Sequence, residues 1–113
     1  MKRVQIVDVV GTPNWIAPEA GLKVYETIVN DIRAGIGVEL SFRGRVFVTT
    51  GFLNSAIGKF YNGDFTDDQL GRLLVCVDTD EEDREKLTRV IARAKEYFKA
   101  PEIHDAVLRQ EPR

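Results

Sequence analysis

Apolar residues recur at steps of three and four in two segments of the chain, and this spacing predicts two amphipathic helices. The first helix is expected to begin near Pro18, which suits a first helical turn, and to end at Gly35, which favours a left-handed cap. Its apolar stripe comprises Leu22, Tyr25, Ile28, Val29 and Ile32. The second helix is expected to begin after Thr79, because Thr79 and Glu82 have the spacing of a capping box. Its apolar stripe comprises Leu87, Val90, Ile91, Ala94 and Tyr97.

Other segments show the shorter pattern of β-strands. Residues 3–10 nearly alternate apolar and polar side chains, and "VELSF" at 38–42 alternates throughout. The continuous apolar run within "RLLVCVDT", 72–79, is typical of a strand buried on both faces. A short extended piece at 46–50 leads into a third helix over 50–61, whose apolar residues cover nearly all sides and indicate burial or a covering partner. This order of elements predicts an α/β domain with mostly parallel strands.

Length and charge narrow the class of protein. A chain of 113 residues is the size of one domain with one core. The net charge of −2 offers no electrostatic argument for nucleic acid or for an anionic membrane as a partner. Cys76 is the only cysteine, so we expect no internal disulfide and a buried thiol in a reducing compartment. No segment resembles a targeting signal or approaches the ~18 apolar residues that span a bilayer, so we expect a cytoplasmic protein.

The sequence offers no constellation of catalytic or metal-binding residues. His104 is the only histidine and lies in the C-terminal tail, so we expect neither a metal site nor a nucleophilic triad. The run at 51–59 ends in Gly-Lys but does not have the glycine spacing of a P-loop. The acidic loop at 64–68 does not have the spacing of an EF-hand. We therefore expect a protein that is not an enzyme and has no cofactor.

The junction "VFVTTGFLN", residues 46–54, places two hydroxyls and a glycine at the expected start of the third helix. Thr49 or Thr50 would cap that helix, a contribution of ~1 kcal/mol to stability. Two further interpretations remain open beside capping alone. Thr50 is a candidate phospho-acceptor, because a phosphate there would lie at the positive end of the helix. The junction is also a candidate docking loop that works without phosphate.

The order of elements and this junction resemble the STAS-like domains, bacterial relatives of the sulphate-transporter and anti-sigma-factor-antagonist fold. The resemblance covers about 21–98 and is carried by "GLKVYETIVNDI", "VELSF", "VTTGFLNSAIGKFY" and "DTDEEDREKLTRVIARAKEYF". It implies a single STAS-like α/β domain over residues 1–98, with a four- to five-stranded mixed sheet and helices mainly on one face. The tail, 99–113, is expected to add a short helix.

The resemblance also implies a regulatory role through a protein partner. In the anti-sigma antagonists the junction is Asp-Ser-Ser-Gly-Leu, and its second serine is phosphorylated by a GHKL-type kinase that also binds the domain. Here Thr49 aligns with the aspartate, Thr50 with the first serine and Gly51 with the phospho-acceptor. Ser41 takes the place of an acidic strand residue. The acceptor position therefore has no hydroxyl, while a docking surface at the junction needs none.

We accordingly expect a non-catalytic interaction domain that docks a protein partner, such as a GHKL-type ATPase or kinase, through the start of the third helix. The expected contact residues are Thr49, Thr50, Gly51, Phe52, Asn54 and Ser55. One alternative is an anion- or nucleotide-binding protein, or an enzyme, that uses residues 49–52. The other alternative is a structural homodimer that forms through the tail.

Overall fold

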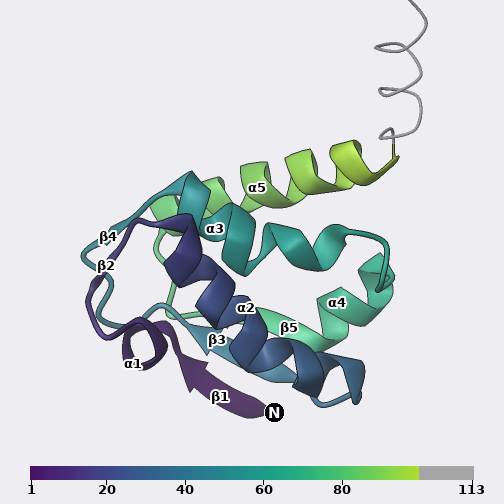
Figure 1. Ribbon diagram of the computed structural model, residues 1–113, viewed down its shortest axis with the longest axis horizontal. Helices are drawn as coiled ribbons and strands as arrows, with labels where there is room; N and C mark the ends of the chain where they lie inside the picture. Colours follow the sequence, from purple (N-terminus) through teal and green to yellow (C-terminus); the bar gives the residue numbers. More distant parts are fainter. Residues whose placement is uncertain (100–113) are drawn as a thin grey trace, which may run out of the picture.

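The computed structural model describes residues 1–99, and the expected tail helix lies outside these residues (Figure 1). Strands and helices alternate along the chain, as the sequence pattern predicts. The elements are β1 (Lys2–Gln5), α1 (Ile6–Val10), β2 (Asn14–Trp15), α2 (Pro18–Arg33), β3 (Val38–Ser41), β4 (Phe47–Val48), α3 (Thr50–Ala56), the 3-10 helix η1 (Gly58–Tyr61), α4 (Asp67–Leu73), β5 (Leu74–Val77) and α5 (Glu81–Lys99). None of the described helices has both the length and the apolar character that crossing a membrane requires.

The main sheet has three parallel strands in the order β1-β3-β5. Both connections move across the sheet in the same direction, so right-handed crossovers place α2 and α3 on the same face. Val4, Leu40 and Cys76 occupy one rung of the ladder and pack into the core beneath these helices. Figure 1 shows α3 lying between α2 and α5, and α3 packs against both.

A single sheet of four or five mixed strands is not confirmed. Within residues 1–99, β2 and β4 form a separate two-stranded parallel ribbon, in which Trp15 pairs with Val48. The ribbon is separate because the chain leaves the main sheet after Gln5. It forms α1 and pairs again only at β2, just before the first residue of α2. Every strand pair that the structure describes is parallel. A parallel pair needs a crossover rather than a hairpin, and here each crossover contains a helix.

The predicted strand at 3–10 is wrong in its second half. The ladder ends where Gln5 pairs with Ser41, the last residue of β3. The chain then forms the short helix α1, which ends at Gly11 with a φ of 84°. Apolar residues within α1 pack against the core, and Ile6 is fully buried. Without a partner strand beyond Ser41, the backbone groups of residues 6–10 gain their hydrogen bonds from a helical turn instead.

The core between the sheet, α2 and α3 is rich in aromatic residues. Trp15 is fully buried, stacks on Phe52 at 5.9 Å and meets Phe42 edge-on at 5.5 Å between ring centroids. The Trp15 indole N–H donates to the Thr12 carbonyl oxygen at 2.7 Å, which satisfies its one polar group. Gly21 lets α2 approach α3 closely, because a Cβ at this position would lie 2.3 Å from the Phe52 carbonyl oxygen. The start of α3 is thereby held against α2 and β2.

Candidate functional site

Thr49 is the residue that caps α3. Its hydroxyl accepts a hydrogen bond from the Phe52 N–H at 3.1 Å and donates one to the Ile16 carbonyl oxygen at 2.7 Å. The Thr49 N–H donates in turn to the Trp15 carbonyl oxygen at 3.0 Å. The side chain therefore joins the start of α3 to the end of β2. Thr50, the other candidate cap, is exposed at the first position of the helix.

The expected contact residues divide between the surface and the core. Thr50 and Asn54 are exposed, and Gly51 and Ser55 are half-buried. Gly51 and Ser55 lie on the side of α3 that faces α2, since a Cβ on Gly51 would have Pro18 at 3.9 Å and Ser55 adjoins Gly21. Phe52 is fully buried, so its side chain belongs to the core and is not presented to a partner. We call Thr50, Gly51, Asn54 and Ser55, together with the backbone around Thr49, the α3 surface.

Three large apolar side chains gather beside this surface, and the sequence pattern did not single them out. Ile16 is 52%, Val46 66% and Phe47 50% exposed, and all three belong to β2, β4 or the residues next to them. We call these three residues the ribbon patch. For Ile16 and Phe47 the signal lay in the alternation of the two strands: Trp15 and Val48 are buried, so the adjacent Ile16 and Phe47 point outward. Val46 precedes β4, and its exposure does not follow from this alternation. The Thr49 hydrogen bond to the Ile16 carbonyl oxygen places Ile16 next to the start of α3.

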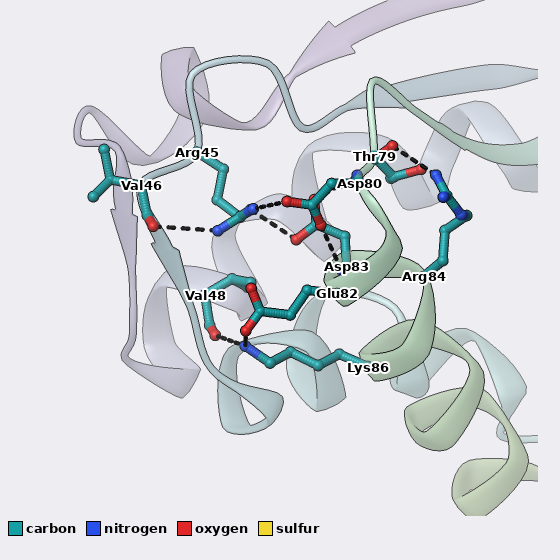
Figure 2. Close-up of polar contacts among 9 residues, drawn as sticks. All are labelled: Arg45, Val46, Val48, Thr79, Asp80, Glu82, Asp83, Arg84 and Lys86. Carbon is teal, nitrogen blue, oxygen red and sulfur yellow. Dashed lines mark hydrogen bonds and ion pairs between the residues drawn. The ribbon is translucent and has the colours of Figure 1, made fainter.

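The start of α5 is fixed by a partly buried charge cluster, shown in Figure 2. The expected capping box of Thr79 and Glu82 is not formed, and Asp80 and Asp83 form the equivalent pair one residue later. The Asp83 N–H donates to Asp80 Oδ1 at 2.8 Å, and the Asp80 N–H donates to Asp83 Oδ2 at 3.2 Å. The Asp83 N–H and the nearby Arg45 guanidinium lower the pKa of the Asp80 carboxyl. Both bonds satisfy N–H groups that a helix start leaves free.

Arg45 connects this cluster to the segment before β4. Its guanidinium contacts Asp80, and its Nε lies 2.7 Å from Asp83 Oδ1. These two atoms form an ion pair without hydrogen-bond geometry, and neither has another partner in the described chain. Arg45 also donates to the Val46 carbonyl oxygen at 3.2 Å. The cluster therefore attaches the segment before β4, including Val46 of the ribbon patch, to the start of α5 (Figure 2).

Lys86 makes a second link between α5 and the ribbon. Its ammonium group donates to the Val48 carbonyl oxygen at 3.0 Å and lies 3.9 Å from Glu82 Oε1 (Figure 2). The same group lies 5.9 Å from the centre of the Phe47 ring, within the range of a cation–π contact. One face of Phe47 is thus covered by Lys86, while half of the residue remains exposed.

The carboxyl end of the main sheet holds a second polar cluster. Asp78, with a φ of 57°, accepts a hydrogen bond from the Ser41 hydroxyl at 2.6 Å and from the Arg3 guanidinium. The Ser41 hydrogen bond is the main cause that lowers the pKa of the Asp78 carboxyl, and the Arg3 bond acts in the same direction. Ser41 is fully buried and also accepts from the Arg43 N–H at 3.2 Å. Ser41 therefore orders the loops that follow β3 and β5.

Cys76 is a desolvated thiol in the edge strand β5. The residue is only partly buried because its strand has no neighbour on one side, but its side chain joins the core. Burial, followed by the nearby Asp83 charge, raises the pKa of the thiol to about 12. The thiol is therefore protonated at neutral pH and is a poor nucleophile. Within residues 1–99, no three histidine, cysteine, aspartate or glutamate side chains are grouped as metal ligands would be.

Residues 20–84 match the family described as the STAS-like domain of unknown function (DUF4325). The chain belongs to this family. The matched residues of the STAS-like domain run from the first turn of α2 to the start of α5 and include all of α3. They also contain Val46 and Phe47 of the ribbon patch, whereas Ile16 precedes them. No curated protein and no solved structure matches the chain.

Proposed function

We propose that this STAS-like domain is a non-catalytic regulatory domain that docks a protein partner through the start of α3 and the adjoining ribbon patch. The observation that carries the proposal is the exposure of Ile16, Val46 and Phe47 on the ribbon whose β2 end is hydrogen-bonded to the cap of α3, beside the exposed Thr50. Single exposed apolar residues are ordinary on protein surfaces, whereas an apolar group with a polar rim is typical of an interaction site. Two of the three are bulky residues that a partner would bury with a substantial gain.

The proposed surface is well ordered before any partner arrives. Thr49 hydrogen bonds join α3 to β2, and Trp15 stacks beneath both elements. Arg45 and Lys86 attach the ribbon to α5. A surface held in this way loses little conformational entropy on binding, which favours affinity. The same attachments explain why short strands of two residues each can present a defined surface.

The partner class follows from the family resemblance rather than from the geometry. We propose a GHKL-type ATPase or kinase as the partner, with both proteins in the cytoplasm. Thr50 is the hydroxyl that such a kinase would reach, because it is exposed at the start of α3 while Thr49 is engaged as the cap. Docking does not require that Thr50 be phosphorylated. The domain would then signal by binding or releasing the partner.

Gly51→Glu tests the proposal. A Cβ at Gly51 would have its nearest neighbours at 3.8 and 3.9 Å, which is ordinary contact, so the structure tolerates a side chain here. The new carboxylate would lie where the α3 surface adjoins the start of α2, and it would block a close approach of the partner to the start of α3. The partner is first isolated with the tagged wild-type chain and purified. We expect it to bind Gly51→Glu at least about tenfold more weakly than it binds the wild type.

Gly71→Glu is the matched control. Gly71 is exposed on α4, and a Cβ there would meet nothing within 4 Å, so the two variants add the same charge at similarly open positions. Gly71→Glu should bind the partner as the wild type does. Normal binding by a folded Gly51→Glu variant would show that the α3 surface is not the docking site.

A further inference from the structure

A groove runs between α3 with η1 on one side and α5 on the other. At one end a hollow of about 170 Å³ is lined by Thr50, Asn54, Arg89, Val90 and Arg93. The adjoining hollow, of about 430 Å³, shares Asn54 and Arg93 and continues past Gly58, Tyr61, Ala94 and Tyr97. We call the two together the α3–α5 groove.

The two walls of the groove repeat at the spacing of a helix turn. Thr50, Asn54 and Gly58 follow at four-residue steps on one wall, and Arg89, Arg93 and Tyr97 do so on the other. From Arg89 to Tyr97, α5 advances by ~12 Å, a little more than two helical turns. A groove of this length between two helical segments can accept about two turns of a third helix.

The charge of the groove is opposite to that of the chain. Among the residues that the structure describes, Arg89, Arg93 and Lys59 line it and no carboxylate does, although the whole chain has a net charge of −2. Within the part of the chain that the structure describes, Arg89 and Arg93 form no ion pair, whereas Arg45, Lys86 and Lys95 each do. Even Glu85, one turn before Arg89, makes no ion pair with it. The two guanidinium groups therefore keep their donors available for a carboxylate.

The larger of the two hollows exposes mainly apolar surface. Tyr97 is 72% exposed, and Tyr61 and the small residues Gly58 and Ala94 line the same hollow. A large exposed tyrosine beside small residues suits an inserted aliphatic or aromatic side chain. The groove thus combines a cationic end with an apolar end.

We propose that the α3–α5 groove binds about two turns of an acidic amphipathic helix from the protein partner. The carboxylates of that helix would contact Arg89 and Arg93, and its apolar residues would pack against Tyr97 and Tyr61. The inference rests on the proposed function, since Thr50 and Asn54 belong to both surfaces. It adds the chemistry of the partner segment, which the ribbon patch by itself does not specify.

The test is a selection from a display library of helical peptides with randomised surface positions. Full-length chain is the target, and the Arg89→Gln/Arg93→Gln variant is used for counter-selection. We expect the recovered peptides to be acidic and amphipathic, with apolar residues at three- and four-residue steps. Recovery of neutral or basic peptides, or of none that distinguish the two targets, would overturn the proposal.

Affinities of one recovered peptide then locate its site. The Arg89→Gln/Arg93→Gln variant should bind about tenfold or more weakly, as should a peptide whose glutamates are replaced by glutamine. The control variant Arg33→Gln/Arg72→Gln removes the same two charges from exposed positions on α2 and near the end of α4, and it should bind normally. Equal weakening by both variants, or equal binding of an oligoglutamate peptide, would mean a general attraction of charge and no groove site.

Two further arms separate this inference from its alternatives. Gly51→Glu should keep its affinity for the peptide, because Gly51 lines neither hollow. If this variant loses binding of the intact partner and still binds the peptide, the loss concerns the α3 surface alone. A synthetic peptide of residues 100–113 should not compete with the recovered peptide. Competition by that peptide would show that the groove holds the tail of this chain, and the partner helix would be the wrong occupant.

Discussion

Arginine occurs in two settings along α5: Arg45, from the segment before β4, contacts the start of the helix, and the pair Arg89 and Arg93 belongs to its later turns. At the start of the helix, Arg45 is largely buried and contacts both Asp80 and Asp83. Two to three turns further on, Arg89 and Arg93 are exposed and form no ion pair within residues 1–99. The first group joins the segment before β4 to α5, and the second faces an open groove. Arginine thus has a structural role at the start of α5 and is available to a ligand along the α3–α5 groove.

The physical reason lies in desolvation. A buried charge needs its partner, because an ion left alone in a protein interior loses its hydration without compensation. An exposed guanidinium remains hydrated and can be removed at little cost to stability. The comparison therefore predicts opposite responses to mutation, which the following variants measure in order of decreasing effect on stability.

Asp83→Ala should produce the largest loss. It removes both the cap on the Asp80 N–H and the carboxylate beside Arg45 Nε, and it leaves the guanidinium partly desolvated. We expect the free energy of unfolding to fall by about 3–5 kcal/mol in a urea melt. Adding Arg45→Met to Asp83→Ala should restore part of the loss, since the desolvated guanidinium is removed and the remaining Asp80 carboxylate is 54% exposed. A loss below about 1 kcal/mol for Asp83→Ala would place this cluster with ordinary surface pairs.

Ile57→Ala provides an apolar reference for the same scale. Ile57 is 1% exposed and lies at the bend between α3 and η1, where its side chain belongs to the hydrophobic core. We expect it to lower the free energy of unfolding by about 2–5 kcal/mol through lost burial and a remaining cavity. At temperatures where the variant is folded, peptide affinity should be unchanged. A stability loss with reduced affinity of the folded protein would show that the groove depends on core packing beneath it.

Acid should weaken the structural cluster and not the exposed pair of arginines. The folded-state pKa values of Asp78 and Asp80 lie below the ordinary value of 3.8. A lowered carboxyl pKa contributes stability that is complete above 3.8 and is lost as the pH falls through the folded-state value. Urea melts between neutral pH and pH 3 should therefore show a decline in stability that Asp80→Asn reduces. Asp64→Asn, in an exposed loop, is the control and should leave the slope unchanged.

Arg89→Gln/Arg93→Gln should produce the smallest change in stability. Glutamine keeps the helix propensity of arginine, and no ion pair within the described residues is broken. We expect the free energy of unfolding to remain within about 0.5 kcal/mol of the wild type, while affinity for the acidic peptide falls. A loss comparable to that of Asp83→Ala would show that these arginines support the fold, and the contrast between the two groups would disappear.

The amino-acid sequence determined the elements whose pattern is local. The helix from Pro18 and the strand at Val38 were predicted nearly to the residue, because periodicity, a first-turn proline and a glycine after the helix act within a few residues. Capping of the third helix by Thr49 or Thr50 was also predicted, and Thr49 is the cap. The family match to residues 20–84 confirms the STAS-like resemblance. Helix α3 was predicted in place but too long, since the chain turns at Ile57 and continues as η1.

Only the tertiary structure decided the features that depend on contacts between distant segments. Residues 6–10 became a helix because β3 offers no further partner, and the ribbon of β2 and β4 joins segments 33 residues apart. The same holds for the ribbon patch, the pairing of Arg45 with Asp83 and the opening beside Arg89. Whether a charge is paired or available is a property of three-dimensional neighbours, and no pattern along the chain specifies it.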